Sequence, residues 1–145
     1  MGGVLIINKL RFVINDNSDN SIKDYKFYCF NGAPKVIMVA SNRFTTHNFN
    51  YFDMGFNPLP ISSVAGKPIN PCLISKPQSF DEMKEIAKAL SKNTAHVRVD
   101  LYEIAGKIYF GELTFFDSSG FDNLNSDVVD LEWGSWITLP SEKIS

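Results

Sequence analysis

Two carboxylates in the second half of the sequence are spaced so that they can bind one metal ion. Asp100 lies in the run 97–102 and Glu112 lies in the run 106–115, with a short connection between them. Both runs are rich in β-branched and aromatic residues, so we expect a β-hairpin. Neighbouring carboxylates repel, and both stay ionised only when a cation lies beside them. Mg²⁺ prefers oxygen ligands, often one or two carboxylates together with substrate phosphates.

The register of this hairpin decides whether the two carboxylates share a face. A two-residue turn would place Glu112 on the face opposite Asp100. A three-residue turn, with Gly106 in a left-handed bulge, pairs Asp100 with Phe110 and Arg98 with Glu112. The apolar pattern favours this bulged register. One face then carries Val97, Val99, Leu101, Tyr109, Leu113 and Phe115, and the other carries Arg98, Asp100, Tyr102, Phe110, Glu112 and Thr114.

An ordinary cross-strand ion pair between Arg98 and Glu112 is the alternative to a metal site. Such pairs are common on sheet surfaces. From spacing alone, the ion pair is the favoured interpretation.

The rest of the chain supplies the elements that must position this hairpin. We expect a strand over 3–14, a polar loop over 15–24, a hairpin of strands 25–30 and 34–40 turning at Asn31-Gly32, and a long irregular connection over 41–77. One helix is expected over 80–90, with Ser79 and Glu82 as a capping box and one buried stripe. The two strands of the carboxylate hairpin are expected over 95–103 and 107–115, and the chain closes with a helix or strand near Trp133 and Trp136.

Composition is that of a globular protein. The chain has 145 residues, 44% hydrophobic and 21% charged, with a formal net charge of -2, so we expect one domain over 1–145. This balance gives no reason to expect nucleic acid as a partner, and no apolar run reaches the length of a membrane span. Cys29 and Cys72 lie outside any Cys-x-x-Cys motif, which fits a reducing, cytoplasmic location.

Several stretches resemble the TupA-like ATP-grasp family, which is associated with cell-surface polysaccharide and teichuronopeptide biosynthesis. They are residues 24–32, 97–102 and 106–115, with a weaker stretch at 48–53 followed by Leu59-Pro60. The resemblance implies an α+β fold, the C-terminal part of an ATP-grasp module, in which a mostly antiparallel sheet is packed by a central helix. It implies a ligase-like protein that binds ATP and Mg²⁺ and activates an unknown carboxylate or glycan substrate. The N-terminal portion of such a module has no counterpart in this sequence.

The same resemblance assigns roles to individual residues. Asp100 and Glu112 match the magnesium ligands and contact the nucleotide through the metal, with Thr114 at a position where many ATP-grasp enzymes have Asn. Lys26 matches a cationic position and is expected to contact phosphate or substrate, and Arg98 is expected to stabilise the transferring phosphoryl group, which makes both candidate catalytic residues. Near the adenosine, Asn8 stands where the first strand usually carries Glu.

Two other functions remain open. One is a noncatalytic ATP-grasp remnant that serves as a partner-binding or oligomerisation module, and the other is a carbohydrate-binding module that uses Trp and Tyr. A missing N-terminal half would leave apolar surface exposed. This predicts a homo-oligomer, for example through the edge of the first strand, or a separate N-terminal partner chain.

Overall fold

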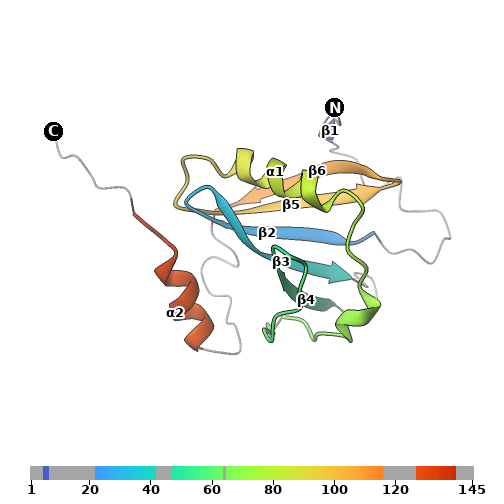
Figure 1. The fold of residues 1–145 in the computed structure, drawn as a ribbon, viewed down its shortest axis with the longest axis horizontal. Coiled ribbons are helices and arrows are strands. Elements are labelled where there is room, and N and C mark those ends of the chain that lie inside the picture. The colour runs from blue at the N-terminus through green and yellow to red at the C-terminus, as the bar shows by residue number, and fades with distance from the viewer. Residues whose placement is uncertain (1–4, 7–21, 42–46, 64, 116–126, 140–145) are drawn as a thin grey trace.

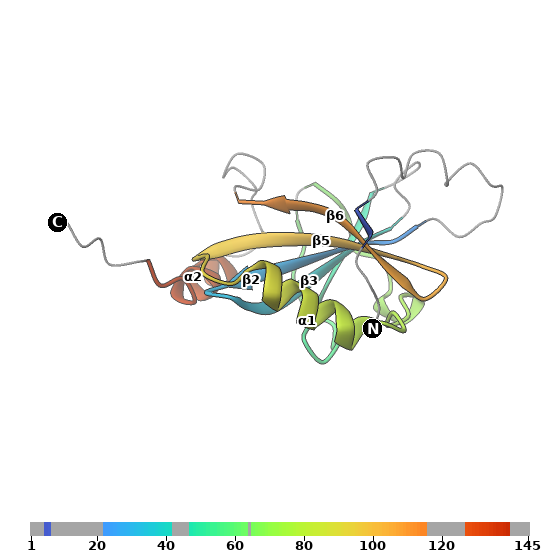
Figure 2. The ribbon, with the colours of Figure 1, turned by 90° about the horizontal axis from the view of Figure 1, so that it is seen from above.

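The structure is a computed structural model that describes residues 5–6, 22–41, 47–63, 65–115 and 127–139. In these residues the chain forms a six-stranded sheet with a helix along one face (Figures 1 and 2). The elements are β1 (Leu5–Ile6), β2 (Asp24–Phe30), β3 (Ala33–Ser41), β4 (Asn48–Asp53), the 3₁₀ helix η2 (Pro71–Leu73), α1 (Phe80–Leu90), β5 (His96–Ile104), β6 (Lys107–Thr114) and α2 (Asp127–Ser135). The strand order is β1-β6-β5-β2-β3-β4, with β1 parallel to β6 and every other neighbouring pair antiparallel. The expected α+β class, with a mostly antiparallel sheet and a central helix, is confirmed.

The β2–β3 hairpin forms as the sequence predicts. Its turn consists of Asn31 and Gly32, with φ of 50° and 77°. Two consecutive positive φ angles are typical of the tight turn whose twist matches that of antiparallel strands, and Asn-Gly is its preferred pair. The hairpin lies in the middle of the sheet, because β2 also pairs with β5.

Helix α1 covers the predicted residues and buries the predicted side. Met83 and Ala87 are fully buried, Ile86 is half-buried, and Leu90 at the end of the stripe is exposed. The prediction of a capping box at the start of α1 is wrong. Ser79 makes no side-chain bond to the helix backbone. Its amide and hydroxyl instead donate to Glu103 Oε1 on β5, so this contact ties the start of the helix to the sheet.

Strand β4 was not expected, because 41–77 was predicted to be an irregular connection. Residues 48–53 pair along β3, while the prolines begin at Pro58 and leave this short segment free to form an edge strand. Tyr51 and Phe52 are buried, as expected for the part of this connection that packs down.

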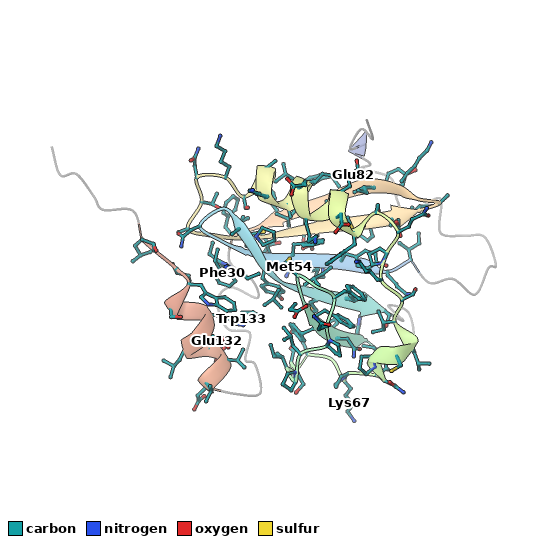
Figure 3. All side chains as sticks on the ribbon, viewed as in Figure 1. Phe30, Met54, Lys67, Glu82, Glu132 and Trp133 are labelled. Carbon is teal, nitrogen blue, oxygen red and sulfur yellow. The ribbon has the colours of Figure 1, made fainter. Side chains whose placement is uncertain are left out.

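The sheet buries apolar side chains on both faces. The first core lies under α1 and contains, among others, Phe27, Val39, Phe80, Met83, Val99 and Leu101. The second core contains Tyr28, Phe30, Val36, Met38, Tyr51 and Ile61, with Trp133 and Trp136 packed against it. Trp133 of α2 points toward Phe30 at the end of β2 (Figure 3), with ring centroids 6.0 Å apart. The segment that contains Trp133, expected to be a helix or a strand, is therefore a helix, and it packs against part of the face opposite α1.

Some expectations at the N-terminus lie outside the described residues. Of the predicted first strand over 3–14, the structure describes Leu5–Ile6 alone, beside β6. Asn8 and most of the polar loop lie outside the described residues, so the homo-oligomer at this edge stays a prediction. The prediction that Asp24 belongs to this loop is wrong, because Asp24 is the first residue of β2 and is buried. In the described part of the chain, no helix is long and apolar enough to span a membrane.

Candidate functional site

The β5–β6 hairpin brings Asp100 and Glu112 together by a register that differs from the expected one. Its turn has two residues, Ala105 and Gly106, with φ of 51° and 75°, so the predicted three-residue turn is wrong. The ladder shifts by one residue between Asp100 and Leu101. Asp100 therefore lies directly opposite Glu112.

The extra residue of this bulge is Gly111, in the middle of β6. Leu101 pairs with Phe110 and Asp100 pairs with Glu112, which leaves Gly111 between them. A Cβ at Gly111 would lie 2.8 Å from Tyr102 Cε2 and 3.0 Å from the carbonyl oxygen of Asp100. The bulge thus requires the small residue that the sequence places there.

This bulge also corrects the expected division of faces. Phe110 packs against the core under α1, whereas the sequence placed it on the polar face. Tyr109 pairs with Tyr102 and so belongs to the opposite face, not to the core. From the turn to Phe110 the strands follow the register of a two-residue turn. Beyond Gly111 the pairing shifts by one residue, so Glu112 lies on the face opposite to the one that simple alternation from Phe110 would give it. The polar face nevertheless receives both carboxylates.

Asp100 is the centre of a set of ion pairs on that polar face. Its side chain is almost fully buried, with 1% of the residue exposed. Arg98 Nε lies 2.7 Å from Asp100 Oδ1, and Arg98 Nη2 donates to Oδ2 at 2.9 Å. Lys26 Nζ lies 2.6 Å from the same Oδ2. Both carboxylate oxygens are thus bound by cations.

The predicted metal ligands converge on one nitrogen of Arg98. Nη2 donates to Asp100 Oδ2, to Glu112 Oε1 at 3.2 Å and to Thr114 Oγ1 at 3.2 Å, and Thr114 Oγ1 in turn donates to Glu112 Oε1 at 3.3 Å. Arg98 is buried, whereas the side chain of Glu112 is 63% exposed. The expected Arg98–Glu112 ion pair is therefore present, but as the outer edge of a buried cluster.

Asp24 is a member of this cluster that sequence reasoning missed. Its Oδ2 lies 2.7 Å from Lys26 Nζ. Burial lowers the pKa of Lys26, but Asp24 and Asp100 together raise it above its ordinary value. Asp24 and Lys26 are two residues apart on β2, a spacing that puts both side chains on one face. This two-residue spacing in the sequence could have indicated that Asp24 lies beside Lys26. We call Asp24, Lys26, Arg98, Asp100, Glu112 and Thr114 the ionic cluster.

The donor set of the ionic cluster suits a hard divalent cation. Two carboxylates and a hydroxyl already surround a positively charged nitrogen, and Mg²⁺ accepts such oxygen ligands alongside water and phosphate. In the described residues no three His, Cys, Asp or Glu side chains are placed to hold a metal ion. A metal held here would therefore depend on Thr114 and on ligands from outside these residues.

A pocket of about 360 Å³ lies elsewhere, beside β4 and the connection that follows it. Its lining includes Asn50, Tyr51 and Ile69, and no residue of the ionic cluster. The pocket and the cluster are therefore separate features.

Comparison with known proteins identifies a family. The model of the family described as TupA-like ATPgrasp matches residues 5–138. Searches of curated proteins and of solved structures give no match. The family match covers nearly the whole chain, including every residue of the ionic cluster. This chain belongs to the TupA-like ATP-grasp family.

Proposed function

We propose that this chain is the magnesium–nucleotide-binding, C-terminal part of an ATP-grasp ligase-like protein that acts in cell-surface polysaccharide biosynthesis. Membership of an ATP-grasp family suggests a nucleotide-binding, ligase-like domain. The role in polysaccharide biosynthesis rests on the resemblance to the family.

One observation supports the site most directly. The side-chain oxygens of Asp100, Glu112 and Thr114 all lie within 3.2 Å of a single cationic nitrogen. Three oxygen ligands from two adjacent strands thus already share one position for positive charge. Mg²⁺ in such a place would screen the phosphate charges during transfer.

The cations of the cluster would act on the phosphates. Lys26 is fixed by two carboxylates, and its raised pKa keeps it charged at neutral pH. Arg98 presents a planar set of donors suited to phosphate oxygens. Lys26 is held by its two carboxylate partners, so it can orient an anionic substrate with little loss of side-chain entropy.

Calorimetric titration of the full chain with ATP and Mg²⁺ tests this proposal. We expect weak binding, with a Kd on the order of 1 mM, because on this proposal the chain supplies only the C-terminal part of an ATP-grasp site. Glu112→Gln removes the exposed carboxylate with little risk to folding and should weaken binding about tenfold. Glu85→Gln removes a carboxylate from the exposed side of α1, on the other face of the sheet, and should leave binding unchanged.

Absence of binding at millimolar ATP would sink the proposal and favour the noncatalytic remnant, a fold kept for contact with a partner. Equal binding by the wild type and Glu112→Gln would also count against it, since the nucleotide would then lie elsewhere.

A further inference from the structure

Arg98 lies where a metal would have to bind. Its Nη2 contacts Asp100 Oδ2, Glu112 Oε1 and Thr114 Oγ1 at 2.9, 3.2 and 3.2 Å. Magnesium–oxygen distances are about 2.1 Å. The same oxygens therefore cannot hold both the guanidinium and a metal without movement of the arginine.

Lys26 is the less suitable cation to be displaced. It is held by Asp24 as well as by Asp100, at 2.7 and 2.6 Å, so it keeps a carboxylate partner when the contacts of Asp100 change. Arg98, by contrast, contacts the same three side chains that would ligate the metal. A metal entering the ionic cluster would therefore compete with Arg98 first.

The charges favour an exchange over simple addition. Among the residues that the structure describes, the ionic cluster contains three carboxylates and two cations, a net charge of one negative unit. Adding a divalent cation while Arg98 stays would leave a net positive charge in a largely buried place, which is unfavourable. If the guanidinium leaves as the metal enters, the cluster becomes neutral.

We propose that Arg98 occupies the divalent-cation position in the metal-free chain and must swing out before Mg²⁺ can bind. An anionic phosphate gives the displaced guanidinium a new partner, so the metal binds more tightly together with nucleotide than alone. Arg98 is then a built-in lock on the metal site as well as a phosphate contact. This inference rests on the proposed function, because it takes the same cluster to be the magnesium site.

Titration of the full chain with Mn²⁺ alone, followed by electron paramagnetic resonance, tests the lock. Arg98→Gln removes the competing charge, and we expect it to bind Mn²⁺ at least tenfold more tightly than the wild type. Lys107→Gln removes an exposed cation near the turn of the same hairpin and should bind Mn²⁺ as the wild type does. Equal or weaker Mn²⁺ binding by Arg98→Gln overturns the inference.

A second measurement needs no change in the binding site. The arginines of this sequence are Arg11, Arg43 and Arg98, so the side-chain Nε signals are few, and the Arg98 signal is the one that persists in both Arg11→Lys and Arg43→Lys. We expect Mg²⁺ with ATP to shift this signal and Mg²⁺ alone to leave it in place at the same concentration. A signal that stays fixed while metal and nucleotide bind contradicts displacement, even if Arg98→Gln does not fold.

The two proposals fail in different ways. ATP binding by the wild type without tighter Mn²⁺ binding by Arg98→Gln removes the lock and leaves the nucleotide site. Tighter Mn²⁺ binding by Arg98→Gln without any ATP binding keeps the lock on a metal site and removes the ligase-like function.

Discussion

At the scale of single residues, Asp100 and Glu112 carry the same charge in very different surroundings. Asp100 is 1% exposed and binds two cations, whereas the side chain of Glu112 is 63% exposed. Removing one partner of a buried ion pair costs about 3–5 kcal/mol, and an exposed pair contributes less than about 1 kcal/mol. We expect Asp100→Asn to lower the free energy of unfolding by about 3 kcal/mol and Glu112→Gln by less than about 1 kcal/mol, measured by urea denaturation.

Equal losses for these two carboxylate-to-amide changes would contradict the buried cluster. The comparison also separates stability from binding. Glu112→Gln is expected to weaken nucleotide binding while leaving the fold nearly as stable as that of the wild type.

The buried thiol of Cys29 should make stability depend on alkaline pH. Burial raises the pKa of Cys29 from 9.0 to about 11. Between these values the unfolded chain loses its thiol proton while the folded chain keeps it. The protonated thiol therefore makes its full contribution to the free energy of unfolding below pH 9. This contribution, about 2–3 kcal/mol, is lost as the pH rises toward 11. Urea denaturation in a reductant across this range would measure the loss.

Cys29→Ala should show a smaller decline with pH than the wild type. Cys72 is exposed, and Cys72→Ala should decline as the wild type does. Tyr25, whose pKa is raised by burial and by Glu103 to about 12, adds a loss above pH 10 that all three chains share. Parallel curves for the wild type and Cys29→Ala would refute the assignment.

At the scale of elements, the bulge at Gly111 sets the register that joins the carboxylates. A methyl group there would press on Tyr102 and on the backbone of Asp100. Such overpacking costs about 1–3 kcal/mol, so Gly111→Ala should destabilise the chain by that amount in chemical denaturation. Gly134 in α2 has nothing within 4 Å of its Cβ position. Gly134→Ala is the matched control and should be neutral or stabilising.

An unperturbed Gly111→Ala chain would mean that the hairpin can adopt another register at little cost. Amide exchange of β6 in that variant would reveal such a slip directly.

The residues of the β5–β6 turn, Ala105 and Gly106, favour positive φ angles less strongly than Asn31 and Gly32 of the β2–β3 turn do. Ala105 adopts φ of 51°, as Asn31 does at φ 50° in the β2–β3 turn, but Ala has no side-chain group to favour the left-handed region. We expect Ala105→Asn to increase the free energy of unfolding by about 0.5–1 kcal/mol, which thermal denaturation would detect as a higher midpoint temperature. The reverse change, Asn31→Ala, should lower it. A loss of stability in Ala105→Asn would contradict the turn geometry.

The sequence predicts most elements of this sheet because their signals are local. Asn31-Gly32 predicts its own turn, and the period of Met83, Ile86 and Ala87 predicts the buried side of α1. Strand β4 was missed because prolines after it suggested an irregular segment, although none lies within 48–53. The capping box failed because Ser79 found a partner on β5, a tertiary contact that spacing within a helix cannot show.

The site residues were predicted more reliably than the register that joins them. Asp100, Glu112, Thr114, Arg98 and Lys26 do come together, although the expected turn was wrong. The alternation of polar and apolar residues indicated that Asp100 and Glu112 share one face. It could not reveal that a bulge at Gly111 inside β6, and not a longer turn, places them there. Asp24 was missed because the polar residues before it made it look like part of a loop.

At the scale of the whole molecule, the face opposite α1 is divided between two kinds of packing. The ionic cluster occupies β2, β5 and β6, and the second core occupies β2, β3 and β4 beneath α2. Strand β2 belongs to both, since Lys26 and Tyr28 point to the same face. Asn31 joins the end of the C-terminal helical segment to the β2–β3 hairpin, because its side chain donates to the carbonyl of Trp136, the residue after α2, at 2.6 Å.

Trp133 is the side chain that should hold α2 on this face. Its ring lies 5.1 Å from that of Tyr28 and 6.0 Å from that of Phe30, whereas Leu131 on the same helix is 75% exposed. Loss of a half-buried tryptophan removes less apolar contact than the 3–5 kcal/mol of a fully buried one, so we expect Trp133→Ala to cost about 2 kcal/mol. Leu131→Ala should change stability by less than about 0.5 kcal/mol.

Hydrogen exchange would show whether the two halves of this face are independent. In Trp133→Ala the amides of α2 should exchange faster, while those of β5 and β6 should keep their protection, because the ion pairs of Asp100 make no use of the tryptophan. Faster exchange throughout β5 and β6 would show that α2 supports the ionic cluster as well. In that case the helix would have to be intact before any metal or nucleotide could bind.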